Sequence, residues 1–224
     1  MVEAAEQDAG TAGRAPSAGR PVVFLGGSRT GVTAGHLPPE VRERVGTIVR
    51  KGMDVVIGDA NGADRALQAL LRDLGCERVT IYVGGAGRIR NRVDPSWPVR
   101  RIGEDSGLAG KELMTLKDEA MGEAATHGLM LWDDVYLNRF GNTSVSSGTL
   151  RNAWQLLGAG KPVALYHVPE GRFYDLGSRN AFERAVLPHC APEAQRYWAE
   201  KLMAPLLKAK RRSGSDAQGS IPGL

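Results

Sequence analysis

The chain has 224 residues, 42% hydrophobic and 24% charged, so we expect one domain of ordinary size with a real core, plus extensions. A net charge of +4 and an aromatic content of 6% argue against a nucleic-acid-binding surface. Cys76 and Cys190 lack a CxxC partner, which argues against a disulfide framework and a zinc site. We therefore expect no metal and no cofactor. With no apolar run near the roughly 20 residues that span a bilayer and no secretion signal, a cytoplasmic protein is expected.

Residues 1–20 are rich in alanine, glycine and polar residues, and we expect them to form a disordered leader. The apolar run of residues 21–25 is typical of a buried parallel strand. It ends in a loop where glycines allow close approach and an arginine can bind a phosphate or carboxylate: Gly26, Gly27, Ser28 and Arg29. The alternative is a tight strand-to-helix turn with Arg29 in solvent.

Pro38 and Pro39 open a predicted helix that extends to about residue 49. A second strand, residues 54–57, precedes a polar turn and a helix ending near Gly75. In open α/β sheets, ligands bind outside the carboxyl ends of the strands, which makes these turn residues candidates: Asp59, Asn61, Gly62 and Asp64. Either aspartate can bind a ribose hydroxyl or transfer protons. An Asx turn with helix capping is the alternative.

The third strand, residues 78–83, ends in a glycine-rich loop that does not match the GxGxxG fingerprint. Arg90 and Asn91 in that loop are candidate ligand contacts, and plain solvent exposure is the alternative. Residues 99–102 resemble an edge strand, and residues 113–126 predict a helix. Asp118 and Glu119 on this helix are either a solvated charged face or, if the helix faces a cleft, candidate catalytic acids.

The fifth predicted strand, residues 129–132, ends at Asp133 and is followed by a polar insertion, residues 135–143, interpreted as a mobile loop. Small polar residues then open a helix, where free backbone N–H groups and the helix dipole suit a phosphate: Ser147, Gly148 and Thr149, with Asn152 one turn on. The alternative is that Ser147 simply caps the helix.

Residues 162–166 form the last predicted strand. Short apolar runs alternating with helices predict an α/β, Rossmann-like, doubly wound parallel sheet with helices on both faces. A helical extension follows over residues 169–212, with helices at 180–186 and 193–208. Residues 213–224 are expected to be a disordered tail.

Three motifs together resemble the SLOG superfamily, the Rossmann-like group that contains LOG phosphoribohydrolases and DprA- and YpsA-like proteins. They are residues 26–29, residues 58–64, and Ser147-Gly148-Thr149 followed by residues 160–163. The second motif looks most like the YpsA-related branch. The resemblance covers residues 21–168 and implies a nucleotide or nucleotide-derived ligand with its phosphate at the glycine loops.

The enzymes of this family, and the related deoxyribosyltransferases, carry a glutamate three residues after the threonine, where this chain has Asn152. An amide cannot act as a carboxylate nucleophile or general base, which puts the family's usual hydrolysis in doubt. A substitute would have to come from nearby carboxylates: Asp59, Asp64, Asp118, Glu119 or Asp133.

We therefore favour a ligand-binding or sensor domain for a nucleotide or nucleotide-derived metabolite. The alternative is a hydrolase or transferase that acts on the N-glycosidic bond of a nucleoside monophosphate. DprA-like DNA binding is the least favoured reading, because no basic stripe is visible. The expected partner is a small nucleotide or nucleotide derivative, with neither nucleic acid nor membrane. A homodimer or higher homo-oligomer is expected by analogy with the fold.

Overall fold

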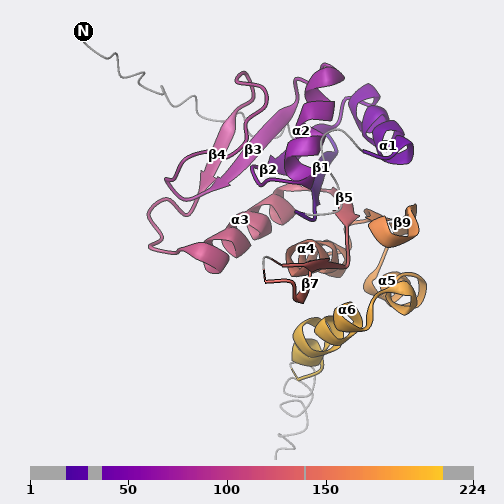
Figure 1. Cartoon of the computed structure of the whole chain (residues 1–224). Coiled ribbons are helices and arrows are strands. Elements are labelled where there is room, and N and C mark those ends of the chain that lie inside the picture. The colour runs from indigo at the N-terminus through magenta and orange to yellow at the C-terminus, as the bar shows by residue number, and fades with distance from the viewer. Residues whose placement is uncertain (1–18, 30–36, 139, 209–224) are drawn as a thin grey trace, which may run out of the picture.

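The computed structural model describes residues 19–29, 37–138 and 140–208. Its centre is a seven-stranded sheet with the order β4-β3-β2-β1-β5-β8-β9, and every neighbouring pair except β8 and β9 is parallel. The strands are β1 (Val22–Gly27), β2 (Asp54–Gly58), β3 (Val79–Gly84), β4 (Val99–Ile102), β5 (His127–Trp132), β8 (Val163–His167) and β9 (Arg172–Leu176). The predicted α/β, Rossmann-like fold is confirmed (Figure 1).

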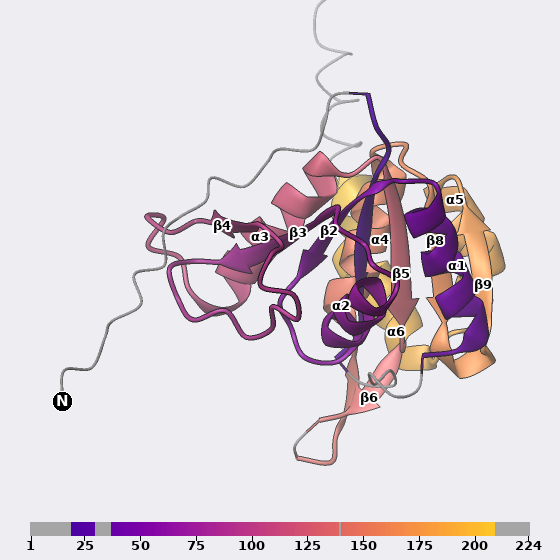
Figure 2. The same ribbon diagram turned by 90° about the horizontal axis from the view of Figure 1, so that it is seen from above.

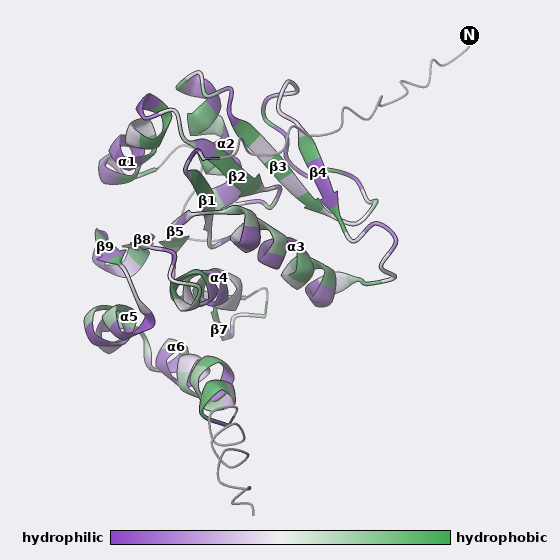
Figure 3. Cartoon of the chain, turned by 180° about the vertical axis from the view of Figure 1, so that it is seen from behind, coloured by the Kyte–Doolittle hydropathy of each residue, from purple (hydrophilic) through white to green (hydrophobic). Residues whose placement is uncertain are grey.

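Helices cover both faces of the sheet (Figures 1 and 2). Those against one face are α1 (Pro39–Arg50) and α2 (Ala63–Asp73); those on the other side are α3 (Gly110–Ala124), α4 (Ser147–Gly158), α5 (Arg179–Ala185) and α6 (Pro192–Tyr197). Successive residues of a strand point to opposite faces, so each central strand feeds two cores. In β1, Val23 and Leu25 join the core under α1 and α2, while Val22 and Phe24 join the core under α3 and α4. This two-sided burial explains why central strands such as β1 and β2 are mostly apolar, visible as green ribbons in Figure 3, whereas β4 at the margin is partly purple.

The direction in which the chain adds strands to the sheet reverses between β1 and β5. From β1 the chain proceeds outward through β2, β3 and β4, and α3 then returns it to β5 on the other side of β1. In open α/β sheets, ligands bind outside the carboxyl ends of the strands at such a switch point. The loops after β1 and β5 therefore mark where a ligand is expected in this architecture.

The polar insertion after β5 is not simply a loop, so that interpretation is wrong. Strands β6 (Val135–Leu137) and β7 (Thr143–Val145) pair as an antiparallel hairpin that projects beyond the carboxyl end of β5 (Figure 2). The Asn138 side chain closes the turn, because its Oδ1 accepts from the backbone N of Phe140 at 2.9 Å and of Asn142 at 3.2 Å. Such side-chain closure is an Asx-type turn.

The sheet does not end at β8, which we predicted to be the last strand. After a 3-10 turn (Val168–Glu170), β9 returns antiparallel to β8 and forms one margin of the sheet, with Arg172 and Asp175 exposed. At the other margin, β4 has only four residues, two of which are Arg100 and Arg101. The domain boundary expected near residue 168 remains a prediction, although β9 extends the sheet past it.

The segment expected to be a helical extension, residues 169–212, begins with β9 and is mainly helical after it. After α5 and a 3-10 turn (Leu187–His189), α6 continues directly into a π-helix (Trp198–Met203), and residues 204–208 are again helical. Trp198 packs edge-on against Trp154 of α4, with ring centroids 5.9 Å apart, which attaches the segment to the α4 core. The expected leader and tail lie almost entirely outside the described residues. Among those residues no helix has the length and apolarity to cross a membrane, and the cytoplasmic location stays a prediction.

Candidate functional site

The loops after β1 and β5 are joined by hydroxyl groups at the switch point. The Oγ of Ser28, directly after β1, accepts a hydrogen bond from the backbone N of Asp133 at 2.9 Å. The Ser146 hydroxyl, at the start of α4, donates to the same Ser28 Oγ at 2.7 Å. Three loops that the sequence analysis placed separately therefore converge on one buried serine.

Close contacts join the loop after β1 to the end of β5 and to the turn after β2. A Cβ on Gly27 would lie only 2.6 Å from the Leu131 carbonyl oxygen and 2.7 Å from the Ala63 Cβ, so only glycine fits there. Gly62 has φ +86°, and a Cβ on it would collide with the backbone of Arg29. These glycines are used for packing between loops, while the Arg29 side chain is exposed.

The N-terminal end of α4, which we call its mouth, has features that suit the anion site expected there from the sequence. The N-cap residue is Ser146 rather than Ser147, and its side chain makes no capping hydrogen bond, so the simple capping interpretation of Ser147 is wrong. The first turn of α4 contains no acidic residue, whereas those of α1, α2 and α3 each contain one. A Cβ built on Gly148 meets no atom within 4 Å, so there is open space beside it, while Thr149 is buried.

A buried cluster of charged and amide side chains lies beside this mouth, between α2, α3 and α4. The Lys117 Nζ of α3 is 3.1 Å from Asp118 Oδ1, and Asn152 Nδ2 of α4 donates to Asp118 Oδ2 at 3.2 Å. A Cβ on Gly58 at the end of β2 would lie 2.9 Å from Lys117 Nζ and against the Asp64 carboxylate. The structure thus brings Asp64, Asp118 and Asn152 together, and Asn152 Oδ1 has no hydrogen-bond partner among the described residues.

Asp64 is the member of this cluster with the strongest electrostatic perturbation. Burial raises its pKa from 3.8 to about 6, against the opposing charge of Lys117 and a hydrogen bond from the Ala60 backbone N. The neighbouring charge of Asp118 pushes in the same direction as burial. A carboxyl group with a pKa near 6 can hold or release a proton close to neutral pH, as general acid–base chemistry requires.

The loop after β3 is held against the loop after β2. Asp59 Oδ2 accepts from the backbone N of Arg90 at 3.1 Å and lies 3.7 Å from its Nε. Asn91 Nδ2 donates to the Asp59 carbonyl and to Asn61 Oδ1, each at 2.9 Å. Arg90 and Asn91 therefore position Asp59, whose other oxygen, Oδ1, is buried without a hydrogen-bond partner among the described residues.

Other predicted residues are distributed as follows. Asp133 is half-buried directly after β5, next to Ser28. Gly26 ends the buried part of β1, where an added Cβ would press on the Phe24 ring. Glu119 is exposed on α3, and no contact of the described residues joins it to the Asp64–Asp118 cluster. Its catalytic role, like those of Asp59, Asp118 and Asp133, stays a prediction.

Two polar residues near the site were missed. Lys117 is 6% exposed. It lies three residues after Met114 and four before Met121, a spacing that puts all three on one face of α3. This spacing is the signal that would have placed Lys117 on the buried face of the helix. Gln68 is fully buried on α2, where its Nε2 donates to the Gly58 carbonyl at 2.8 Å and its Oε1 accepts from the Val93 backbone N at 3.0 Å. Gln68 therefore links the loops after β2 and β3, which together hold Asp59.

A separate cavity of about 380 Å³ opens at the amino ends of β5 and β8, between those strands and α1. Its walls include Ile48, His127, Val163 and Leu176. None of the predicted site residues lines it. It is therefore distinct from the switch point, which lies at the carboxyl ends of the same strands.

Comparison with protein-family models and with curated proteins finds no match. A solved structure that matches is DNA processing protein A (DprA) from Helicobacter pylori, solved to study how that protein binds single-stranded DNA. It is 14% identical, with a TM-score of 0.44, over 84% of this chain and 81% of that chain. This similarity is to a DprA protein, one of the groups named in the resemblance above, and the YpsA-related branch remains a prediction.

The sequence-based expectation about partners is corrected by this match. We expected nucleic acid to be excluded on grounds of charge, yet the matched structure belongs to a protein that binds single-stranded DNA. Total charge alone does not exclude a single strand, because a strand is also bound through local contacts with its phosphates and bases. The exclusion of nucleic acid is therefore withdrawn.

Proposed function

We propose that the chain binds the phosphate of a nucleotide at the switch point, as a ligand-binding domain of SLOG type in its YpsA-related branch. The observation that carries this proposal is the convergence of the β1 loop, the β5 loop and the α4 mouth on Ser28. The first amides of a helix have no partner within the helix, so at α4 they are directed to the point where these loops meet.

The distribution of charge supports the orientation of the ligand. A phosphate fits best at the mouth of α4, because the first turn there carries no carboxylate. The acidic side lies toward α2 and α3, where Asp59 and Asp118 can accept hydrogen bonds from sugar hydroxyls. A nucleotide with its phosphate at Gly148 and its sugar toward Asp118 therefore places each group against a partner of suitable charge.

The shared chemistry, a phosphate attached to a sugar and a base, occurs both in free nucleotides and in a single strand. A binding assay separates these sources by comparing nucleoside monophosphates, the matching nucleosides and a short single-stranded oligonucleotide. We expect the monophosphates to bind at least tenfold more tightly than the nucleosides. If only the oligonucleotide bound tightly, the site would be assigned to single-stranded nucleic acid.

The decisive variant places a negative charge at the helix mouth. Gly148→Asp adds a carboxylate where an added side chain has room, and Gly148→Asn adds nearly the same volume without charge. We expect Gly148→Asp to weaken phosphate binding at least tenfold, about 1.4 kcal/mol, and Gly148→Asn to weaken it much less.

Gly122→Asp on α3 is the matched control for net charge, since an added Cβ there also meets no atom within 4 Å. It should bind as the wild type does. Equal binding by Gly148→Asp and Gly148→Asn, or equal affinity of the wild type for nucleosides and monophosphates, would refute a phosphate site at α4.

The raised pKa of Asp64 favours a second function, hydrolysis or transfer at the N-glycosidic bond. With Asn152 in the position of the family's glutamate, Asp64 is the described carboxyl group best suited to donate a proton to a departing base near neutral pH. The test is chromatographic detection of free base after incubation with nucleoside monophosphates. We expect Asp64→Asn to lose at least a hundredfold in base release and the exposed Asp105→Asn to lose nothing. Absence of base release in the wild type refutes this function and leaves the binding proposal intact.

A further inference from the structure

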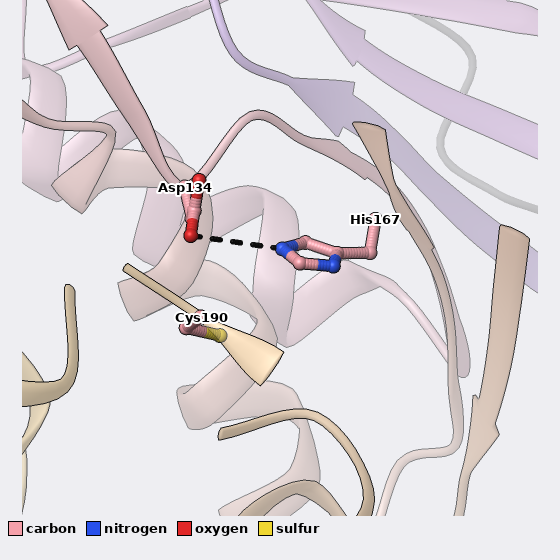
Figure 4. A group of neighbouring side chains, drawn as sticks. All are labelled: Asp134, His167 and Cys190. Carbon is pink, nitrogen blue, oxygen red and sulfur yellow. Dashed lines mark ion pairs between the residues drawn. The ribbon is translucent and has the colours of Figure 1, made fainter. Parts of the chain in front are cut away.

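A second group of polar side chains, not absorbed by the proposed function, lies where β5, β8 and the C-terminal segment meet (Figure 4). Asp134 follows β5, His167 ends β8, and Cys190 lies in the link between α5 and α6. Their ligand atoms all lie within 4.8 Å of one another, and Figure 4 shows the carboxylate and the imidazole facing each other. The three residues are 3%, 0% and 6% exposed.

The imidazole of His167 is held in one orientation but is left incompletely paired. Its Nδ1 is 2.9 Å from Glu170 Oε2, a distance that fits an N–H donated to that carboxylate. Its Nε2 is buried without a hydrogen-bond partner among the described residues, 3.8 Å from Asp134 Oδ2. A carboxylate behind one ring nitrogen is the usual support of a histidine that binds a metal through the other.

The thiol of Cys190 completes the group. In the metal-free chain its Sγ donates a hydrogen bond to the Val186 carbonyl oxygen at 3.3 Å. Metal binding to a thiol releases its proton, so a bound dication would replace this hydrogen bond with a metal–sulfur bond. Cys76, the other buried cysteine, has no such carboxylate and imidazole group beside it among the described residues.

We propose that Asp134, His167 and Cys190 bind a divalent transition-metal ion, and that zinc is the best match. Sulfur, imidazole nitrogen and carboxylate oxygen together are the donor set of zinc sites. With bonds of about 2.1 Å, two ligand atoms of a tetrahedral zinc lie roughly 3.4 Å apart, so the Asp134–His167 distance of 3.8 Å needs to shorten by only a few tenths of an ångström.

The enclosure of the site indicates a structural role. The metal would link the carboxyl ends of β5 and β8 to the α5–α6 link, where Asp134 Oδ2 already accepts from the Ala191 backbone N at 2.7 Å. The second carboxylate oxygen of Asp134 or a water molecule can supply the fourth ligand. This inference replaces the sequence-based expectation that the chain has no metal site. It is independent of the proposed nucleotide site, because it uses none of its side chains.

The test uses the full chain, treated with a chelator and titrated with Co²⁺, whose thiolate complexes show a charge-transfer absorption band. Since the chain has only two cysteines, the band assigns the thiolate directly. We expect one Co²⁺ per chain and a thiolate band that Cys76→Ser keeps and Cys190→Ser and His167→Gln lose. Zn²⁺ should displace Co²⁺ and raise the thermal midpoint by about 5 °C or more.

Any of three results would overturn the proposal. The first is a wild-type chain that binds no Co²⁺ at equimolar concentration, as expected if His167 forms only a metal-free ion pair with Asp134. The second is a band that disappears in Cys76→Ser. The third is a band that persists in a folded Cys190→Ser. Because Cys76→Ser keeps the whole cluster, the outcome does not depend on whether the ligand variants fold.

Discussion

Asp64 is a residue whose burial makes the stability of the whole chain depend on pH. Its folded-state pKa of about 6 lies above its ordinary value of 3.8, so between these values the folded chain retains a proton that the unfolded chain has released. Stability therefore decreases as the pH rises from about 4 to about 6. At about 1.4 kcal/mol per pKa unit, the total loss is about 3 kcal/mol.

Replacement of Asp64 by Asn should remove this dependence. We expect the free energy of unfolding of Asp64→Asn, relative to the wild type, to increase by about 3 kcal/mol between pH 4 and pH 6.5 and then to level off. Urea unfolding at each pH measures it, and Asp105→Asn, an exposed position, is the control. A difference that stays constant across this range would show that Asp64 titrates normally.

Single residues also show what the sequence does and does not reveal. Asp59, Asp64 and Asn152 were found because they follow strand ends or match a family position, and the structure brings Asp64 and Asn152 into one cluster. The group of Asp134, His167 and Cys190 was missed, because its members come from three distant segments and no spacing rule connects them. Only the fold places them together.

At the scale of elements, a row of aromatic rings contributes to the attachment of the C-terminal segment, whose apolar side chains pack against the core under α4. Trp198 of the π-helix contacts Trp154, and Trp154 in turn contacts Phe182 of α5 edge-on, with centroids 6.0 Å apart. Aromatic pairs of this geometry contribute beyond the area that they bury. This row of rings joins α4, α5 and the π-helix.

Trp198→Ala should therefore lower the free energy of unfolding by about 2 kcal/mol, less than for a fully buried tryptophan because Trp198 is half-buried. Leu207→Ala, on the same segment but 50% exposed, should cost less than about 0.5 kcal/mol. Urea denaturation of both full-length variants tests this. Equal losses in the two variants would mean that the tryptophan row does not carry the attachment.

The elements that the sequence predicted well are those buried on both sides. Strands such as β1 and β5 are continuous apolar runs, and their burial pattern follows from that composition. β9 was missed because Arg172 and Asp175 interrupt its pattern, as expected for an antiparallel strand at a margin. The β6–β7 hairpin was missed because each strand has only three residues.

At the scale of the whole molecule, stability should decrease from the centre of the sheet outward. β1 and β5 are hydrogen-bonded on both sides and covered by helices on both faces. The β6–β7 hairpin is a two-stranded sheet of its own, with Leu137 70% and Phe140 71% exposed. A hairpin of two strands is only marginally stable by itself, and this one packs against the core under α4 through Val135 and Val145 at its base.

Amide hydrogen exchange should resolve this order. We expect the amides of β1 and β5 to exchange only through global unfolding, and those of the β6–β7 hairpin to exchange at least a hundredfold faster. Exchange followed by mass spectrometry or NMR under native conditions measures both. Hairpin amides protected as strongly as those of β5 would contradict this order and would indicate that the hairpin packs against something further.

The two margins of the sheet carry a consequence for assembly. A strand with an open row of amides and carbonyls is a template on which another chain can polymerise, and charged side chains and short length discourage this. β4 has only four residues, of which Arg100 and Arg101 are charged. Arg100 also donates a hydrogen bond to the Tyr82 hydroxyl at 3.2 Å. β9 presents Arg172 and Asp175, the latter bound to Arg44 at 2.9 Å. Lateral growth of the sheet into fibrils is thus disfavoured at both ends by charge.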